Sequence, residues 1–144
     1  MLTPWLLIYR VFYRDRAMTN INSSFSEESG IRLSQLKSLL GKGSNSEISS
    51  QTCLSAYQEF DSLYGAARAM DMPDLETLCQ NLASYMLYIN SLLPAKLSQF
   101  QQALLQDGLN LLDDALLTQR YSTSHIHDFL HELSTEINKG GTIS

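Results

Sequence analysis

The sequence is poor in the residues that sheets and rigid loops require. Valine occurs once and proline three times in 144 residues, whereas leucine is abundant. This balance favours helix over sheet. The chain carries 10 Lys and Arg against 15 Asp and Glu, a net charge of −5. A phosphate-binding surface needs clustered positive charge, and because no such cluster occurs we do not expect nucleic acid as a partner.

Motifs for catalysis and metal binding are also missing. The chain has no GxGxxG or Walker A phosphate loop, no Ser/His/Asp order and no CxxC or Cys/His metal spacing. We therefore expect no enzyme activity, no cofactor and no metal site. The two cysteines, Cys53 and Cys79, stand alone within helical patterns. Two buried free thiols are a simpler prediction than a disulfide, and they favour a reducing, cytoplasmic location.

The N-terminal stretch MLTPWLLIYRVFYRDRAM combines a short apolar run, Trp5–Ile8, with arginines at 10, 14 and 16. The positive charges follow the apolar run, which is the wrong order for a secretory signal, and the run is too short to span a bilayer. Three interpretations stay open: a helix that contacts a membrane surface through residues 1–17, a peripheral helix packed on the domain, or an extension upstream of a start at Met18. The polar stretch TNINSSFSEES predicts a linker, so we assign residues 1–28 to an extension and linker.

The remaining residues predict five amphipathic helices, with apolar residues three and four positions apart. Their expected ranges are about 29–40, 46–70, 73–93, 95–119 and 124–137. Leu54 and Phe100 fall on the main apolar stripes of their helices, and Asp71 and Pro73 are expected to cap and begin the third helix. Short connections between long helices predict antiparallel neighbours. We therefore expect an all-α, up-down helical bundle over residues 29–137, followed by a flexible tail, 138–144.

The second and third predicted helices carry an ordered set of residues in YQEFDSLYGAARAMDMPDLETLCQNL, residues 57–82. An aromatic residue is followed by a Leu and a Gly, then by small residues, an apolar corner and a Leu-rich face. The positions are Tyr57, Leu63, Gly65, Ala66, Ala67, Met70-Asp71-Met72, Leu75, Leu78, Cys79 and Leu82. This order resembles the histidine phosphotransfer (HPt) family, most closely the N-terminal domain of CheA-type kinases. The resemblance implies a four-helix core with a peripheral helix, and a receiver or kinase domain as partner.

The chain departs from the HPt pattern where the chemistry would occur. Asp61 stands in the place of the phosphorylated His, and Tyr64 in the place of the Lys three residues later. A neutral imidazole is a good nucleophile near pH 7, whereas an exposed Asp without a metal and Lys is not. The resemblance therefore implies a degenerate, non-catalytic module that keeps only a docking surface. Its partner-binding residues would be Tyr57, Asp61, Tyr64, Gly65 and Arg68.

Gly65 has two competing explanations. A glycine inside a helix costs roughly 1 kcal/mol relative to Ala, so close approach of another surface is expected there. That surface is either the partner or another helix of the same bundle. If Asp61 and Gly65 were buried inside the bundle, a helical chaperone or adaptor would become the better interpretation.

All three histidines lie in HIHDFLHEL, at positions 125, 127 and 131. His127 and His131 are four residues apart, a spacing that can bind a metal, but no third ligand accompanies them. His131, in HELST, is an alternative phosphoacceptor for an active phosphorelay protein, although it lacks the Lys and Gly of the HPt motif. The adjacent acids Asp113 and Asp114 suit a solvated helix edge better than a catalytic pair.

Overall fold

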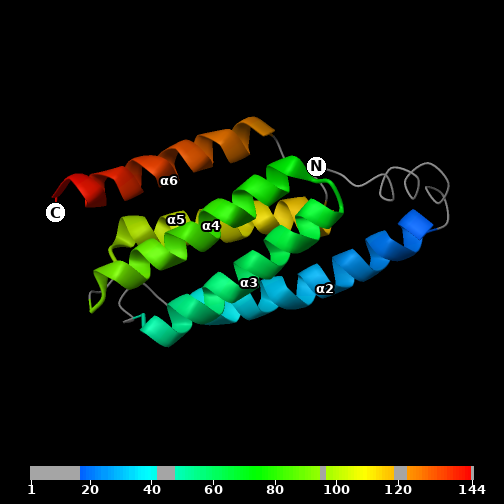
Figure 1. Cartoon of the computed structure of the whole chain (residues 1–144), viewed down its shortest axis with the longest axis horizontal. Coiled ribbons are helices and arrows are strands. Elements are labelled where there is room, and N and C mark those ends of the chain that lie inside the picture. The colour runs from blue at the N-terminus through cyan, green and yellow to red at the C-terminus, as the bar shows by residue number, and fades with distance from the viewer. Residues whose placement is uncertain (1–16, 42–47, 95–96, 119–122, 144) are drawn as a thin grey trace.

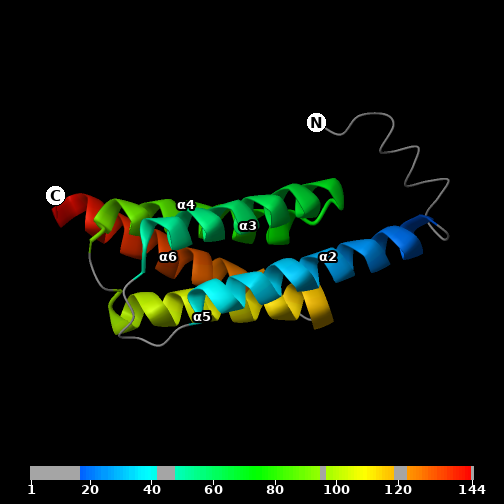
Figure 2. The same cartoon turned by 90° about the horizontal axis from the view of Figure 1, so that it is seen from below.

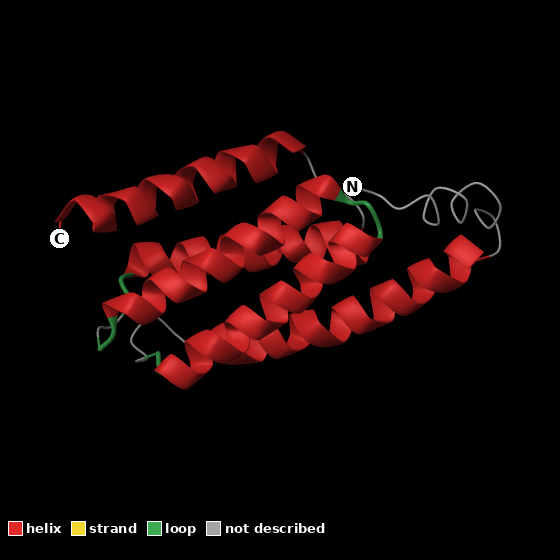
Figure 3. Cartoon of the chain, in the orientation of Figure 1, coloured by secondary structure: helices red, strands yellow, loops and turns green. Residues whose placement is uncertain are grey.

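The structure is a computed structural model that describes residues 17–41, 48–94, 97–118 and 123–143. Five α-helices and one π-helical turn account for nearly all of these residues, and no strand occurs among them (Figure 3). The elements are α2 (Ala17–Leu40), α3 (Ser50–Ala69), α4 (Pro73–Leu92), α5 (Gln99–Asp113), η1 (Asp114–Thr118) and α6 (Thr123–Ile143). The prediction of an all-α fold is confirmed.

Consecutive helices alternate in direction, as expected for an up-down bundle (Figure 1). Contacts join α2 to α3, α3 to α4, α4 to α5 and α5 back to α2, so these four helices close a ring. The α3–α4 pair forms one layer, and α2 and α5 form the other (Figure 2). Helix α6 packs on α4 and, to a smaller extent, on α5. The described chain is therefore a four-helix bundle with a fifth helix along one side.

One prediction about the ends of the chain is wrong. The polar stretch 19–29, which we expected to be a linker, belongs to α2, which begins at Ala17. Once the apolar part of this helix is anchored in the bundle, each added residue gains a hydrogen bond, so a polar stretch without proline can extend it. Helix α6 extends to Ile143, into the stretch 138–144 for which we predicted a flexible tail, and that flexibility stays a prediction. The possible membrane contact through residues 1–17 falls almost wholly on 1–16, which lie outside the described residues.

The corner between α3 and α4 is built differently from our expectation. Asp71 does not cap α4, because Met72 precedes that helix and makes no side-chain cap. Instead, Asp71 has a left-handed backbone (φ 55°) and ends α3. Its N–H donates to the Arg68 carbonyl (3.1 Å), and that of Met72 donates to the Ala67 carbonyl (2.9 Å), the two bonds of a Schellman motif. Pro73 is the first residue of α4, as predicted.

The core is built from apolar side chains of all five α-helices. Its largest fully buried members are Leu33, Leu36, Phe60, Leu63, Leu75, Leu78, Leu82, Tyr85, Met86, Ile89, Leu104 and Leu105. Cys53 and Cys79 are also buried, and both are free thiols, as predicted. Burial raises the pKa of both thiols, for Cys79 to about 12.

Two residues predicted to face inward are exposed: Leu54 by 44% and Phe100 by 51%. The buried residues of α3 are Cys53, Ala56, Phe60, Leu63 and Ala67, spaced alternately by three and four. Leu54 lies beside this stripe. We had located the buried face from large side chains such as Leu54 and Tyr57, whereas the buried face also contains the smaller Cys53 and Ala56. Phe100 is in the first turn of α5, where the space toward α6 is an open groove.

Candidate functional site

Helix α3 carries the residues singled out in the sequence. The helix begins after Ser49, whose hydroxyl accepts a hydrogen bond from the Thr52 N–H (3.1 Å), a normal N-cap. The stripe of small and apolar residues described above holds one side of α3 against the bundle. Tyr57 and Tyr64 are half-buried and pack against the edge of this core. The opposite side of the helix is exposed to solvent.

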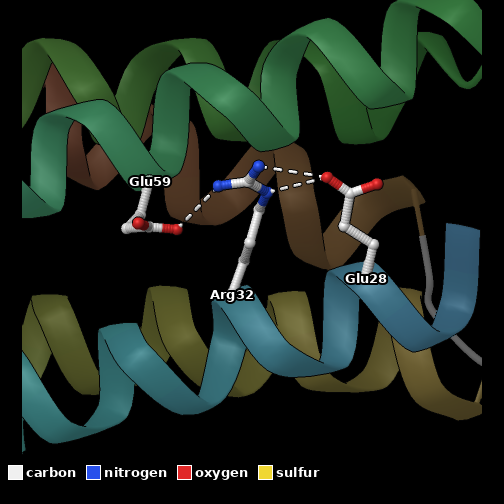
Figure 4. Close-up of polar contacts among 3 residues, drawn as sticks. All are labelled: Glu28, Arg32 and Glu59. Carbon is white, nitrogen blue, oxygen red and sulfur yellow. Dashed lines mark hydrogen bonds and ion pairs between the residues drawn. The ribbon is translucent and has the colours of Figure 1, made fainter.

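A polar bridge fixes α3 against α2 (Figure 4). The Arg32 guanidinium donates to Glu59 of α3 (3.1 Å) and to Glu28 of α2 (3.0 and 3.3 Å). These carboxylates raise the pKa of Arg32, with the hydrogen bond to Glu28 as the largest cause. Two positions along a helix of 3.6 residues per turn point to nearly opposite sides. Glu59 therefore faces α2, whereas Asp61 faces away from it.

The five predicted partner-binding residues share one face of α3. Their spacing of four, three, one and three residues keeps Tyr57, Asp61, Tyr64, Gly65 and Arg68 within about a third of the helix circumference. Asp61, Gly65 and Arg68 are exposed, and the two tyrosines form the border with the core. We call these five residues the α3 face. Asp61 and Gly65 are not buried against another helix, which is the arrangement that would have favoured the unrelated adaptor.

Gly65 is not explained by packing inside the bundle. Apart from the neighbouring residues and the backbone of α3 itself, no described atom lies within 4 Å of the position that a Cβ at residue 65 would occupy. Gly108 of α5 is the opposite case, because a Cβ there would stand 2.7 Å from Leu82 Cδ2 and 3.0 Å from Phe129 Cζ. Of the two explanations for Gly65, close packing against a second helix of the bundle is therefore wrong.

The α3 face offers charged and aromatic contact groups. Asp61 and Arg68 carry opposite charges on the exposed side, and neither makes an ion pair with another described residue. Within the described ranges, no three His, Cys, Asp or Glu side chains are placed to hold a metal ion. A carboxylate without a neighbouring metal and cation has no means of stabilising a transferred phosphoryl group.

The other residues singled out in the sequence are dispersed. His125, His127 and His131 are exposed on α6, and His131 borders a groove beside Phe100. Asp113 pairs with Lys37 of α2 at 2.7 Å, which joins α5 to α2. Its neighbour Asp114 begins the π-helical turn and is exposed. The structure therefore brings none of these groups to the α3 face.

A feature that the sequence reasoning missed is a groove between α5 and α6. It has a volume of about 310 Å³ and is lined by Asp107, Asn110, Leu111, Asp114, His125, Asp128, Phe129 and Glu132. These residues come from two helices whose register we had no means of predicting. The available signal was the charge distribution, because residues 97–138 contain six acidic residues and only one basic residue, Arg120.

Comparison of the chain with known protein families, with curated proteins and with solved structures finds no match. The resemblance to the HPt family therefore stays a prediction carried by the residues of α3 and α4. In the part of the chain that the structure describes, no helix is both long and apolar enough to cross a membrane.

Proposed function

We propose that this chain is a non-enzymatic interaction module, a degenerate HPt-like domain of bacterial two-component or chemotaxis-like signalling. Through the α3 face it docks on a receiver domain or a histidine kinase in the cytoplasm and accepts no phosphate. By occupying that partner it sequesters the partner or places it within a complex.

The observation that carries this proposal is Gly65. A glycine in the middle of an exposed helix is unfavourable by roughly 1 kcal/mol, and the bundle gains no packing in return. Space above Gly65 lets a partner surface approach the backbone of α3 closely. The half-buried Tyr64 beside it offers the kind of aromatic group that dominates many protein interfaces.

The chemistry around the candidate acceptors supports a module that does not receive phosphate. Asp61 is exposed and has no described cation beside it that could hold a phosphoryl oxygen. His131, the alternative acceptor, is exposed and therefore accessible, but its groove also contains Glu132 and Glu136. The negative charges of these two carboxylates disfavour the approach of a phosphoryl group, which is itself negatively charged.

The docking proposal is tested by substitution at Gly65, with purified receiver and kinase domains of the native host as probes. Gly65→Leu is expected to weaken binding by about tenfold or more, as at an interface hot spot, because the side chain fills the space that the partner needs. Ala103→Leu is the matched control, since Ala103 is an exposed small residue on α5. The proposal would be contradicted if Gly65→Leu and Ala103→Leu bound these domains equally well. It would also be contradicted if neither the parent chain nor either variant bound them.

Phosphate acceptance is tested by incubating the full chain with a phosphorylated receiver domain and with an active kinase and ATP. No stable label on the chain is expected. Label that persists on the parent chain and disappears in His131→Ala would establish the active phosphorelay alternative. Label that disappears in Asp61→Asn would also overturn the proposal, because it would make the α3 face a phosphoacceptor site.

A further inference from the structure

The groove between α5 and α6 has a consistent chemical character. Carboxylates line both sides of it, with Asp107 on α5 and Asp128 and Glu132 on α6. Leu111 is half-buried between them and Phe129 is almost fully buried, and none of the described lining residues is a Lys or an Arg. A second groove of about 300 Å³ shares Glu132 and includes the half-exposed Phe100. The two grooves adjoin at Glu132 of α6.

The same chain contains a segment of the complementary character. Residues 1–16 hold three of the ten basic residues, Arg10, Arg14 and Arg16, and only one acidic residue, Asp15. They also hold Trp5, Tyr9, Phe12 and Tyr13, an unusual density of aromatic side chains. Arginine pairs with carboxylates through a planar fork of donors, and aromatic side chains cover apolar surface.

The topology brings the groove within reach of this segment. Helix α2 starts at the end of the bundle where α5 finishes and α6 begins (Figure 1). The groove residues belong to the second half of α5 with η1 and to the first half of α6, so they lie toward that end. A chain of 16 residues reaches up to about 50 Å when it is extended. Its attachment to α2 gives it a high effective concentration at the groove.

We propose that residues 1–16 bind in the α5–α6 groove of their own chain, with the arginines on the groove carboxylates and the aromatic side chains on Leu111 and on the exposed Phe100 of the adjoining groove. This surface is separate from the α3 face, so the inference goes beyond the proposed docking function. It gives the N-terminal segment an intramolecular site where the sequence alone left a membrane surface, a peripheral helix and an upstream extension open.

Trp5 is the only tryptophan in the sequence and reports directly on this site. In the full chain we expect blue-shifted Trp5 emission and weak quenching by acrylamide. In Asp128→Asn/Glu132→Gln the docked fraction should fall by about three- to tenfold, because two partly exposed ion pairs are lost. Emission should then shift to the red and quenching should increase. Raising the salt concentration should have the same effect in the parent chain, since salt screens surface charges.

The matched control is Asp61→Asn/Glu76→Gln, which removes two carboxylates on α3 and α4 and should leave Trp5 emission unchanged. Arg10→Gln/Arg14→Gln tests the other side of the contact and should reproduce the effect of the groove variant. Circular dichroism shows that each variant keeps its helices. The inference is overturned if Trp5 is fully exposed in the parent chain, or if the groove variant and the α3–α4 control behave alike.

Two further outcomes would assign the segment to a different site. Emission that depends on protein concentration would show that the segment binds a second copy. A blue shift seen only with phosphatidylglycerol vesicles, and unaffected by the groove variant, would show that it binds an anionic membrane surface. Either result overturns the intramolecular assignment.

Discussion

Gly65 of α3 and Gly108 of α5 lie in the middle of their helices, as Gly30 of α2 also does, and the surroundings of Gly65 and Gly108 are opposite. Gly108 of α5 lies in the seam between α4 and α6, where a methyl group would meet Leu82 and Phe129. Gly65 of α3 lies on an exposed surface with open space above it. The first glycine lets helices of one chain pack closely. The second does nothing for the packing of this chain.

This difference separates residues that build the bundle from residues that are available to a partner. Both glycines lower the intrinsic helix propensity by a similar amount. Only at position 108 does the fold recover that cost, through the contacts of Leu82 and Phe129. A cost that the fold does not recover is a reason to look for a second molecule, and this is why we place the docking surface on α3.

The largest expected effect distinguishes the packed seam from an exposed site on the same helix. Gly108→Leu should lower the free energy of unfolding by about 2 kcal/mol or more, because the new side chain overfills the space beside Leu82 and Phe129. Ala103→Leu, on the exposed side of α5, should stay within about 0.5 kcal/mol of the parent. Urea unfolding monitored by circular dichroism measures both. Equal stabilities would show that the seam is loosely packed.

The burial of Cys79 in the core predicts that the free energy of unfolding depends on pH in the alkaline range. Burial raises the pKa of the Cys79 thiol from its ordinary value near 9 to about 12. The unfolded chain therefore releases this proton near pH 9 while the folded chain retains it. The stabilising contribution is complete below pH 9 and falls as the pH rises toward 12, by up to about 1.4 kcal/mol per pH unit.

Cys79→Ala is the control for this pH effect. Between pH 9 and 10.5 its free energy of unfolding should decline less steeply than that of the parent chain. Some slope should remain, because burial also raises the pKa values of Cys53 and Tyr85. If the two slopes were the same, Cys79 would not be shielded from water in the folded chain.

On the open surface, removing the glycine should stabilise the fold. Gly65→Ala should raise the free energy of unfolding by about 1 kcal/mol, since alanine has the higher helix propensity and its methyl group meets no described atom. The same variant is expected to bind the receiver or kinase less tightly. A gain in stability with a loss of binding would distinguish an interface residue from a structural one. A loss of stability would show that Gly65 has a structural role.

The smallest expected effect compares two acids on opposite sides of α3. Glu59→Gln removes one of the two carboxylate partners of Arg32 and should cost about 1 kcal/mol, because the Arg32–Glu59 pair is partly buried. Asp61→Asn should change stability by less than about 0.5 kcal/mol, as expected for an exposed residue outside any ion pair of the described structure. Equal costs would mean that Asp61 contributes to the fold, and the α3 face would then lose its simplest interpretation.

Much of the fold was predictable from the periodicity of leucine. The range of α4 was predicted to within a residue, because Pro73 fixes its start and Leu75, Leu78, Leu82 and Ile89 mark its buried side. The start of α2 was missed because Ser, Asn and Thr dominate its first turns, although Met18, Ile21 and Phe25 recur there at helical spacing. For α3 the helix was right but its buried face was shifted, because Ala56 and Cys53 are weaker hydrophobic signals than Leu54 and Tyr57.

The α3 face and the α5–α6 groove also differ in how far the sequence could predict them. The α3 face lies within one helix, where a spacing of three or four residues places side chains on the same surface whatever the rest of the fold does. The sequence alone therefore named its members. Whether that surface was covered depended on the neighbours of α3, and the open space at Gly65 was decided only by the packed bundle.

The acidic groove was beyond the reach of the sequence because its two sides come from different helices. Asp107 and Asp128 lie 21 residues apart along the chain, and only the register of α6 against α5 brings both into one groove. The sequence by itself determined the helices, their charge and the residues that share a helix face, because these follow from local geometry and composition. The tertiary structure decided which faces are covered and which meet across helices, because burial depends on contacts between distant parts of the chain.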